Sequence, residues 1–240
     1  MLLLAAILVI IGLGDILRSL LQTGTFGTIA ALGGVAALVL LATGLLTGIP
    51  WWAVALCGIP ALLWFHTISV RQPTGSVRGT APQVLVFVLL CGGLTVLGDT
   101  VAPAGEVVPV PAVGRFDTEL AALAAGVALF HVVSANAVVR LALSAEKHGR
   151  SAAESELLVR KPQLKGGRWI GPLERITLTG LLVAGAYPVA AGLIAAKGII
   201  RFPEMHQDRA EGNKAEYFLV GSFVSWTIAI IAAGLLWSVA

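Results

Sequence analysis

A stretch of 52 residues, from Ser19 to Val70, contains no Asp, Glu, Lys or Arg. A helix needs about 20 apolar residues to cross a hydrocarbon core of about 30 Å, so this stretch is long enough for two spans. The segment Gly48-Ile49-Pro50-Trp51-Trp52 divides it near its middle, and indole rings favour the headgroup level of a bilayer. The stretch therefore predicts an all-α, polytopic helical membrane protein.

Charge is scarce in the rest of the chain as well. Only 12% of the residues are charged and 57% are hydrophobic, whereas soluble domains carry about 25% charged residues. A water-soluble surface is therefore excluded. The uncharged runs predict seven spans, at about 1–21, 27–47, 50–69, 80–98, 119–142, 173–200 and 217–239.

The first span is expected to continue past Asp15 and Arg18. It has no basic residue before Arg18, so we interpret it as a retained span rather than as a secretory signal. Six spans are the alternative, with this segment lying at the membrane interface. We expect three regions: an N-terminal five-helix membrane region at 1–143, a cytoplasmic loop at 144–171, and a C-terminal two-helix membrane hairpin with a charged connection at 172–240.

Basic residues predict the orientation, because they collect on the cytoplasmic side of a membrane. Eleven of the sixteen fall on one side of the seven-span arrangement: Arg18, Arg71, Arg78, Arg140, Lys147, Arg150, Arg160, Lys161, Lys165, Arg168 and Arg175. This places residue 1 outside and residue 240 in the cytoplasm of a cell whose plasma membrane holds the protein. The connection between the last two spans opposes this orientation, because it also carries basic residues.

The main candidate polar site lies at that connection. Lys197 and Arg201 are four residues apart and share a helix face, so they need a negative partner. Glu204 follows within a turn, and Glu216 precedes the last span. A helical hairpin would bring Glu216 beside Lys197 or Arg201. These four residues form either a structural clamp or the lining of a polar cavity for an ion, a proton or a lipid headgroup.

Glu174 and Arg175 are secondary candidates at the start of the sixth span. A continuous helix from Pro172 to Phe202 would be about 45 Å long. It would place Glu174 and Lys197 near opposite faces of the membrane, so the two could not pair within one subunit.

His131, Asn136 and Arg140 are the other secondary candidates, on the fifth span. His131 is expected near the bilayer centre, hydrogen-bonded to a neighbouring helix or acting as a proton relay. Asn136 and Arg140 share a helix face away from His131, so the three do not form a compact catalytic set.

Several chemistries lack their sequence signatures. Cys57 and Cys91 are the two cysteines, and we interpret them as buried free thiols rather than a disulfide. There is no Cys-x-x-Cys, no phosphate-binding glycine loop followed by Lys, no His-Glu-x-x-His and no Gly-x-Ser-x-Gly. We therefore expect no metal site, no cofactor and no nucleic-acid partner.

A row of small residues recurs every four positions on the sixth span: Ala184, Pro188, Gly192 and Ala196. Such rows let helix backbones approach closely. They predict a homo-oligomer, most simply a dimer, with this span at or near the interface.

Four short motifs in the last 70 residues carry a family resemblance. They are Glu174-Arg175, Ala195-Ala196-Lys197, Arg201-Phe202-Pro203-Glu204 and Glu216-Tyr217-Phe218-Leu219-Val220-Gly221. Together they resemble the C-terminal membrane module of an uncharacterised bacterial multi-pass membrane protein family. The resemblance covers about 65 residues and implies a bacterial plasma-membrane protein. It implies no activity or substrate.

Three functions remain open. The first is a small transport or conduction protein whose polar site is the connection between the last two spans. The second is a structural or accessory subunit that binds another membrane protein. The third is a lipid-modifying enzyme using Glu204, Glu216 or His131 as acid or base. An enzyme is the least favoured of the three, and the lipid bilayer is a partner in all of them.

Overall fold

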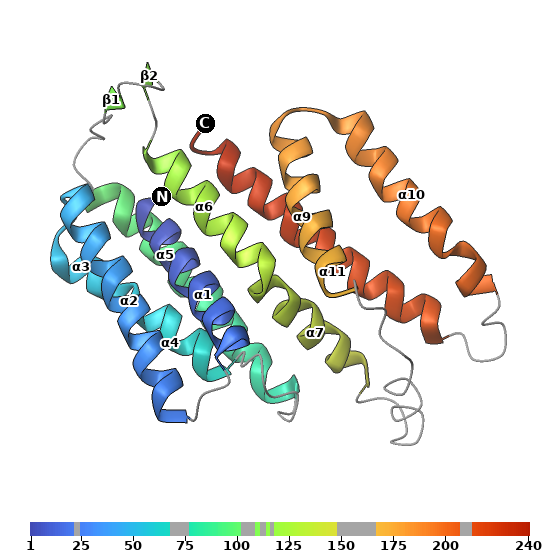
Figure 1. Cartoon of the computed structure of the whole chain (residues 1–240), viewed down its shortest axis with the longest axis horizontal. Helices are drawn as coiled ribbons and strands as arrows, with labels where there is room; N and C mark the ends of the chain where they lie inside the picture. The colour runs from blue at the N-terminus through green and yellow to red at the C-terminus, as the bar shows by residue number, and fades with distance from the viewer. Residues whose placement is uncertain are drawn as a thin grey trace. The chain divides into compact units, whose positions relative to one another are not determined.

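A computed structural model describes the backbone of residues 1–21, 25–67, 77–101, 109–110, 114–115, 118–147, 167–206 and 213–240. Side chains are described for residues 1–21, 27–67, 84–101, 118–143, 169–200 and 218–240. The described chain is α-helical apart from short turns and one antiparallel pair of two-residue strands, β1 (Pro109–Val110) and β2 (Gly114–Arg115) (Figure 1). The all-α prediction is confirmed.

The chain divides into two compact units, which are described separately. Unit 1 contains Met1–Ala137 and Val239–Ala240, and unit 2 contains Val138–Ser238. Helix α7 (Ser134–Lys147) begins in unit 1 and continues into unit 2.

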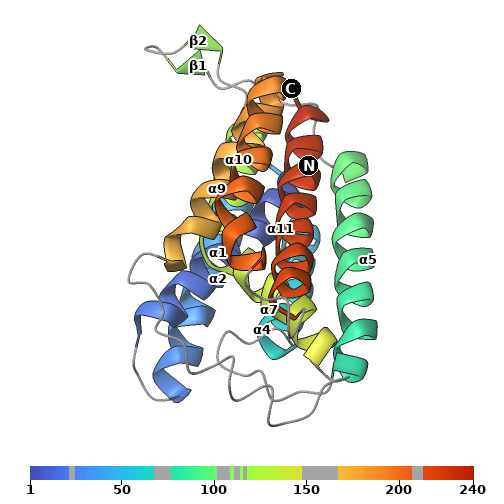
Figure 2. The ribbon, with the colours of Figure 1, turned by 90° about the vertical axis from the view of Figure 1, so that its right-hand side faces the viewer.

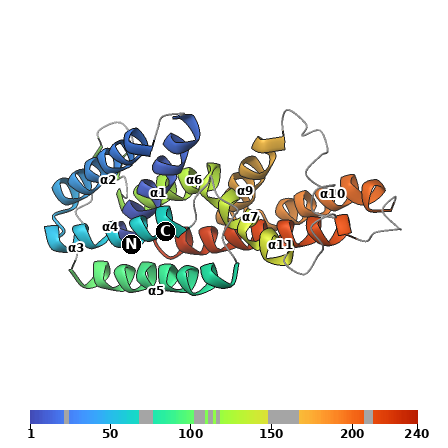
Figure 3. The same cartoon turned by 90° about the horizontal axis from the view of Figure 1, so that it is seen from below.

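Helix α1 (Leu2–Leu20) is the centre of unit 1. Four other helices pack against it: α2 (Thr25–Thr47), α4 (Gly58–Thr67), α5 (Val77–Val101) and α6 (Thr118–Val132). Figure 3 shows α2 and α5 on different sides of α1. A helix enclosed in this way must be apolar around most of its circumference, and α1 meets that need with Leu, Ile, Val and Ala at most positions.

Helix α6 makes the closest approach to α1, through two glycines. A Cβ atom at Gly12 would lie 2.7 Å from the Cβ of Leu129, and one at Gly126 would lie 3.0 Å from the carbonyl oxygen of Ala5. Because Leu8 meets Gly126 and the later Gly12 meets the later Leu129, the two helices run parallel. Larger side chains at either glycine would force the backbones apart.

The break predicted within the long charge-free stretch is confirmed. Helix α2 ends at Thr47, Gly48 adopts φ 65°, and α3 (Trp51–Leu56) begins after Pro50. Proline suits a helix start because its missing N–H would have no intrahelical partner there. The α3 and α4 helices together cover a mainly apolar segment of 17 residues, Trp51–Thr67, which is shorter than the predicted 50–69 span.

Unit 2 contains α9 (Gly167–Val183), α10 (Tyr187–His206) and α11 (Asn213–Trp237). The prediction of one continuous helix from 172 to 202 is therefore wrong, and the C-terminal segment has three helices rather than two. The turn is a Schellman motif: Gly185 has φ 70°, its N–H donates to the Leu182 carbonyl (3.1 Å), and the Ala186 N–H donates to the Leu181 carbonyl (2.8 Å). Helix α10 then returns alongside α9 (Figure 2).

Four helices in the described part of the chain are long and apolar enough to cross a membrane. They are α1, most of α2, the part of α5 at Val84–Val101, and the part of α11 at Phe218–Trp237. Helices α6 and α7, bent by 48° at their junction, qualify together as a fifth span. These helices are consistent with a membrane location, and the count of seven spans stays a prediction.

Candidate functional site

Polar contacts join α9 to α11 along much of their length. The Nη1 atom of Arg175 donates to the Ser225 hydroxyl (3.2 Å), Thr179 donates to the Ala229 carbonyl (3.3 Å), and Trp237 donates to the Val183 carbonyl (3.3 Å). Later residues of α9 meet later residues of α11, so the two helices run in the same direction. Leu178, Ala190 and Ala229 form the apolar core beside these contacts.

The main charged site of unit 2 joins all three of its long helices. Lys197 on α10 places its Nζ atom 2.7 Å and 2.6 Å from the two carboxylate oxygens of Glu174 on α9. Trp226 on α11 donates its indole N–H to Oε1 of Glu174 (2.8 Å). The exposed fraction is 12% for the Glu174 side chain and 24% for that of Lys197. We call Glu174, Arg175, Lys197, Ser225 and Trp226 the polar cluster.

Aromatic rings surround the ammonium group of this ion pair. The Nζ atom of Lys197 lies 5.5 Å from the ring centroid of Trp226 and 5.7 Å from that of Phe218. Both distances fall within the range of cation–π attraction. Phe223 packs edge-on against Trp226 at 5.6 Å between centroids and so helps to hold the indole in place. The Lys197 charge is therefore stabilised by one carboxylate and two ring faces.

The polar cluster lies at mid-depth of a candidate membrane span. Trp226 and Ser225 fall near the middle of the apolar segment Phe218–Trp237, and Arg175 beside them is buried. Ionisable side chains at such a depth are costly unless they pair with one another or line a polar path. The pairing of Glu174 with Lys197 meets this requirement within one chain.

This pairing corrects the prediction that Glu174 and Lys197 lie at opposite membrane faces. The reversal at Gly185 folds α10 back along α9, so residues 23 positions apart meet at one level. Two residues of the cluster, Ser225 and Trp226, were missed by the sequence analysis. A signal for the reversal was present, because Gly185 followed by Pro188 is typical of a helix end.

Three residues of the predicted polar site have side chains that lie outside the described residues. Arg201 and Glu204 lie in α10 and Glu216 lies in α11, but their side chains are outside the described residues. The pairing of Glu216 with Arg201 therefore stays a prediction, whereas the described carboxylate partner of Lys197 is Glu174.

The candidates on the fifth predicted span fall on two helices. His131 is buried in α6, Asn136 near the start of α7 donates to the Val132 carbonyl at the end of α6 (3.4 Å), and Arg140 is exposed on α7. Cys57 and Cys91 are free thiols in the structure, and Cys57 is buried whereas Cys91 is partly buried. Among the described residues, no group of three His, Cys, Asp or Glu side chains could hold a metal ion.

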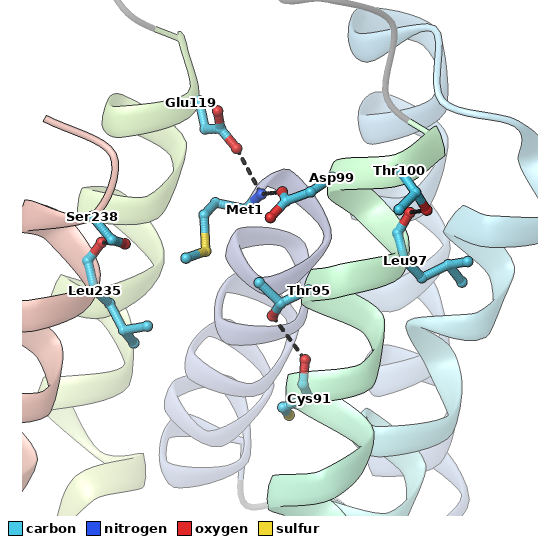
Figure 4. Close-up of polar contacts among 9 residues, drawn as sticks. All are labelled: Met1, Cys91, Thr95, Leu97, Asp99, Thr100, Glu119, Leu235 and Ser238. Atoms are coloured by element: carbon cyan, nitrogen blue, oxygen red, sulfur yellow. Dashed lines mark hydrogen bonds and ion pairs between the residues drawn. The ribbon is translucent and has the colours of Figure 1, made fainter.

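A second ionic site lies at one end of unit 1, in Figure 4. The ammonium group of Met1 lies 2.6 Å from an Asp99 carboxylate oxygen and 2.7 Å from one of Glu119. Burial lowers the pKa of this ammonium group, but the hydrogen bonds and negative charges of Asp99 and Glu119 outweigh burial, and the net effect raises the pKa. The contacts link the starts of α1 and α6 to the end of α5.

No protein-family model, curated protein or solved structure matches this chain. The resemblance to a bacterial membrane protein family therefore stays a prediction, and function must be inferred from the geometry of the two units.

Proposed function

We propose that this protein is a multi-pass protein of a bacterial plasma membrane with a structural role, as an accessory subunit of a membrane complex. One observation carries the proposal: Glu174 is held from both of the other long helices of unit 2, by Lys197 of α10 and by Trp226 of α11. A carboxylate engaged in this way joins helices inside an apolar surrounding. Its charge is neutralised by the fold rather than offered to a passing ion.

Transport or conduction is the second candidate, and the exposure of Lys197 favours it. About a quarter of the Lys197 side chain is exposed in the chain itself, so an anionic cargo or a lipid headgroup could reach the ammonium group. A lipid-modifying enzyme needs an acid and a base that converge at a water-accessible cleft. The carboxylates considered for that role, Glu204 and Glu216, have no described side chains, so no observation favours an enzyme.

The parallel course of α9 and α11 also leads to a revised membrane topology. The N-terminal ends of both helices lie on the same side, so the connection between α10 and α11 lies on the side where α9 begins. This adds Arg201, Arg209 and Lys214 to ten of the eleven basic residues already placed there, making thirteen of the sixteen. Arg175 and Lys197 lie within the membrane, and Arg115 alone falls on the far side. The positive-inside bias is therefore better satisfied than in the seven-span arrangement.

The revised arrangement has eight crossings. They are α1, α2, α3 with α4, α5, α6 with α7, α9, α10 and α11. Helix α10 has 20 residues, or about 30 Å at the α-helical rise, which matches a hydrocarbon core. Residues 1 and 240 then both lie outside the cytoplasm, which replaces the expected cytoplasmic position of residue 240.

A homodimer through α10 completes the proposed assembly. A Cβ atom at Gly192 would meet nothing within 4 Å, so this face of α10 is open to a second copy or to lipid. Gly33 on α2 is equally open and provides a matched control. Gly192→Leu should weaken self-association while Gly33→Leu should not, if backbones approach each other at α10.

Reconstitution into liposomes tests the structural role against transport. We expect the wild-type protein to leave the permeability to K⁺, Cl⁻ and protons at the level of protein-free vesicles. Glu174→Gln should lower thermal stability, and Glu174→Gln combined with Lys197→Met should recover part of the loss. An ion flux through the wild type that disappears in a fully folded Glu174→Gln variant would overturn the structural proposal in favour of transport.

A further inference from the structure

A second intramembrane site emerges in unit 1, around a carboxylate that sequence reasoning treated only as part of a helix. Asp15 lies on the central helix α1 and has an exposed fraction of 0%. Its Oδ2 atom accepts a hydrogen bond from the indole N–H of Trp64 on α4 (3.0 Å). Burying a carboxyl group in an apolar bundle is costly, so its presence there indicates a role that a hydrophobic residue could not perform.

Trp64 is itself fixed by aromatic contacts. Its ring centroid lies 5.2 Å from that of Phe87 on α5 and 5.3 Å from that of Phe130 on α6. The indole therefore connects Asp15 to helix α6 and keeps its N–H directed at the carboxylate. This is a preorganised hydrogen bond within a closed aromatic surrounding.

The register of α1 and α6 brings further polar side chains to the level of Asp15. Gly12 meets Leu129 and Phe130 across the closest helix contact. Asp15 is one turn beyond Gly12, and the helices run parallel, so Asp15 lies level with about residues 132–134. His131 and Ser134 flank that level, and both are buried, with exposed fractions of 1% and 0%.

The helix changes direction at this level. Helix α6 ends at Val132, α7 begins at Ser134, and the two are bent by 48°. The Ser134 hydroxyl is buried and has no hydrogen-bond partner within the described part of the chain. Broken helices within membrane proteins commonly occur where buried polar groups bind an ion or substrate.

Few other ionisable side chains surround this level. Arg18, one turn further along α1, directs Nη1 to the Phe65 carbonyl (3.5 Å) and lies over the Phe65 ring. Among the described side chains of unit 1, α4 adds His66, the residue between α3 and α4 is Cys57, α5 adds Cys91 and α2 adds none. The carboxylates of Asp99 and Glu119 are at the other end of α1, with Met1.

We propose that Asp15 and His131 form an internal proton-binding site of unit 1, with Trp64 orienting the carboxylate and Ser134 supplying a hydroxyl at the same level. The ligand is a single proton taken from water and released to it, and no bond other than O–H or N–H forms or breaks. The site is independent of the polar cluster of unit 2 and of the structural role proposed for it.

Infrared spectroscopy of the full-length protein in lipid nanodiscs tests the site. Aspartate carboxyl carbons labelled with ¹³C separate Asp from Glu absorption, and the protonated-carboxyl band is followed from about pH 4 to about pH 9. We expect one titrating aspartic acid band that Asp15→Asn removes and Asp99→Asn leaves unchanged. His131→Gln should move its midpoint by about one pH unit.

Two outcomes of this experiment would contradict the proposed proton-binding site. If Asp15→Asn removes no titrating aspartic acid band in this range, the Asp15 carboxyl group does not exchange a proton and the proposal fails. A band that belongs to Asp15 but keeps its midpoint in His131→Gln would also overturn the shared site. If Asp15→Asn does not fold, the midpoint in His131→Gln decides, because that variant retains the labelled carboxyl group.

Discussion

Replacing Glu174 by Gln removes one charge from the ion pair that joins α9 to α10, while the length of the side chain is kept. The ammonium group of Lys197 then loses its carboxylate partner and keeps only the ring faces of Trp226 and Phe218. Replacing Lys197 by Met leaves the opposite defect, a carboxylate held by the Trp226 indole alone among the contacts just described. Each variant therefore leaves one charged group without its ion-pair partner in a mostly buried position.

The size of the effect follows from burial and distance. Two unit charges 2.6 Å apart attract by about 6 kcal/mol at an effective dielectric constant of about 20, before desolvation is subtracted. Breaking a buried pair by removing one partner costs about 3–5 kcal/mol, whereas a neutral interhelical hydrogen bond in a bilayer averages about 0.6 kcal/mol. Because both side chains are partly exposed, we expect about 3 kcal/mol for each single variant.

The double variant, Glu174→Gln with Lys197→Met, should be no less stable than either single variant. It leaves no unpaired charge, and the side-chain carbonyl of Gln can still accept a hydrogen bond from the Trp226 N–H. We expect the double variant to lose about 3 kcal/mol or less of unfolding free energy. This corresponds to a coupling energy of about 3 kcal/mol between Glu174 and Lys197, at the upper end of measured values for contacting residues.

Unfolding in mixed micelles with increasing denaturing detergent, followed by helix circular dichroism, measures these differences. Arg140→Met is the control, because it removes an exposed charge from α7 and should change stability by less than about 0.5 kcal/mol. Additive losses in the double variant would refute the clamp, because they would mean that Glu174 and Lys197 stabilise the protein independently. Unchanged stability in both single variants would refute it equally.

Three further predictions concern topology, assembly and pH. With an impermeant thiol reagent on intact cells, Ser238→Cys should be labelled from outside and Ser155→Cys should not, and labelling at position 155 would reverse the orientation. Gly192→Leu should lower the dimer fraction measured by light scattering in detergent, and an unchanged fraction would remove α10 from the interface. The raised pKa of the Met1 ammonium group means that its ion pairs stabilise fully below its ordinary value and lose their contribution as the pH rises through the raised one. The thermal midpoint should therefore fall as the pH rises above about 8, and less so in Asp99→Asn.

The sequence by itself determined the class of the protein and most of its helices. Long runs without charge favour helices of membrane-spanning length, and the helices near 2–20, 25–47, 77–101 and 213–237 could be predicted from these runs alone. The break at Gly48-Ile49-Pro50 was also predictable, since glycine and proline act on their own backbone and need no distant partner.

Only the tertiary structure decided whether residues 172–202 form one helix or two. An apolar segment of that length is compatible with a tilted helix and with a hairpin. The left-handed conformation of Gly185 selects the hairpin, and packing against α11 stabilises it. The charge pattern alone could not show this, because the partner of Lys197 is Glu174, 23 residues earlier in the chain.

The surroundings of Asp15 were equally beyond the sequence. Periodicity predicts a helix around Asp15 but not that this helix is the centre of unit 1. All the predicted spans are apolar, so their composition does not specify which helices pack against one another. The close approach at Gly12 and Gly126 sets the register of α1 against α6. That register brings His131 and Ser134 to the level of Asp15, and the fold brings the Trp64 indole N–H to its carboxylate. Sequence could not show this, because contacts between distant segments depend on which helix faces meet.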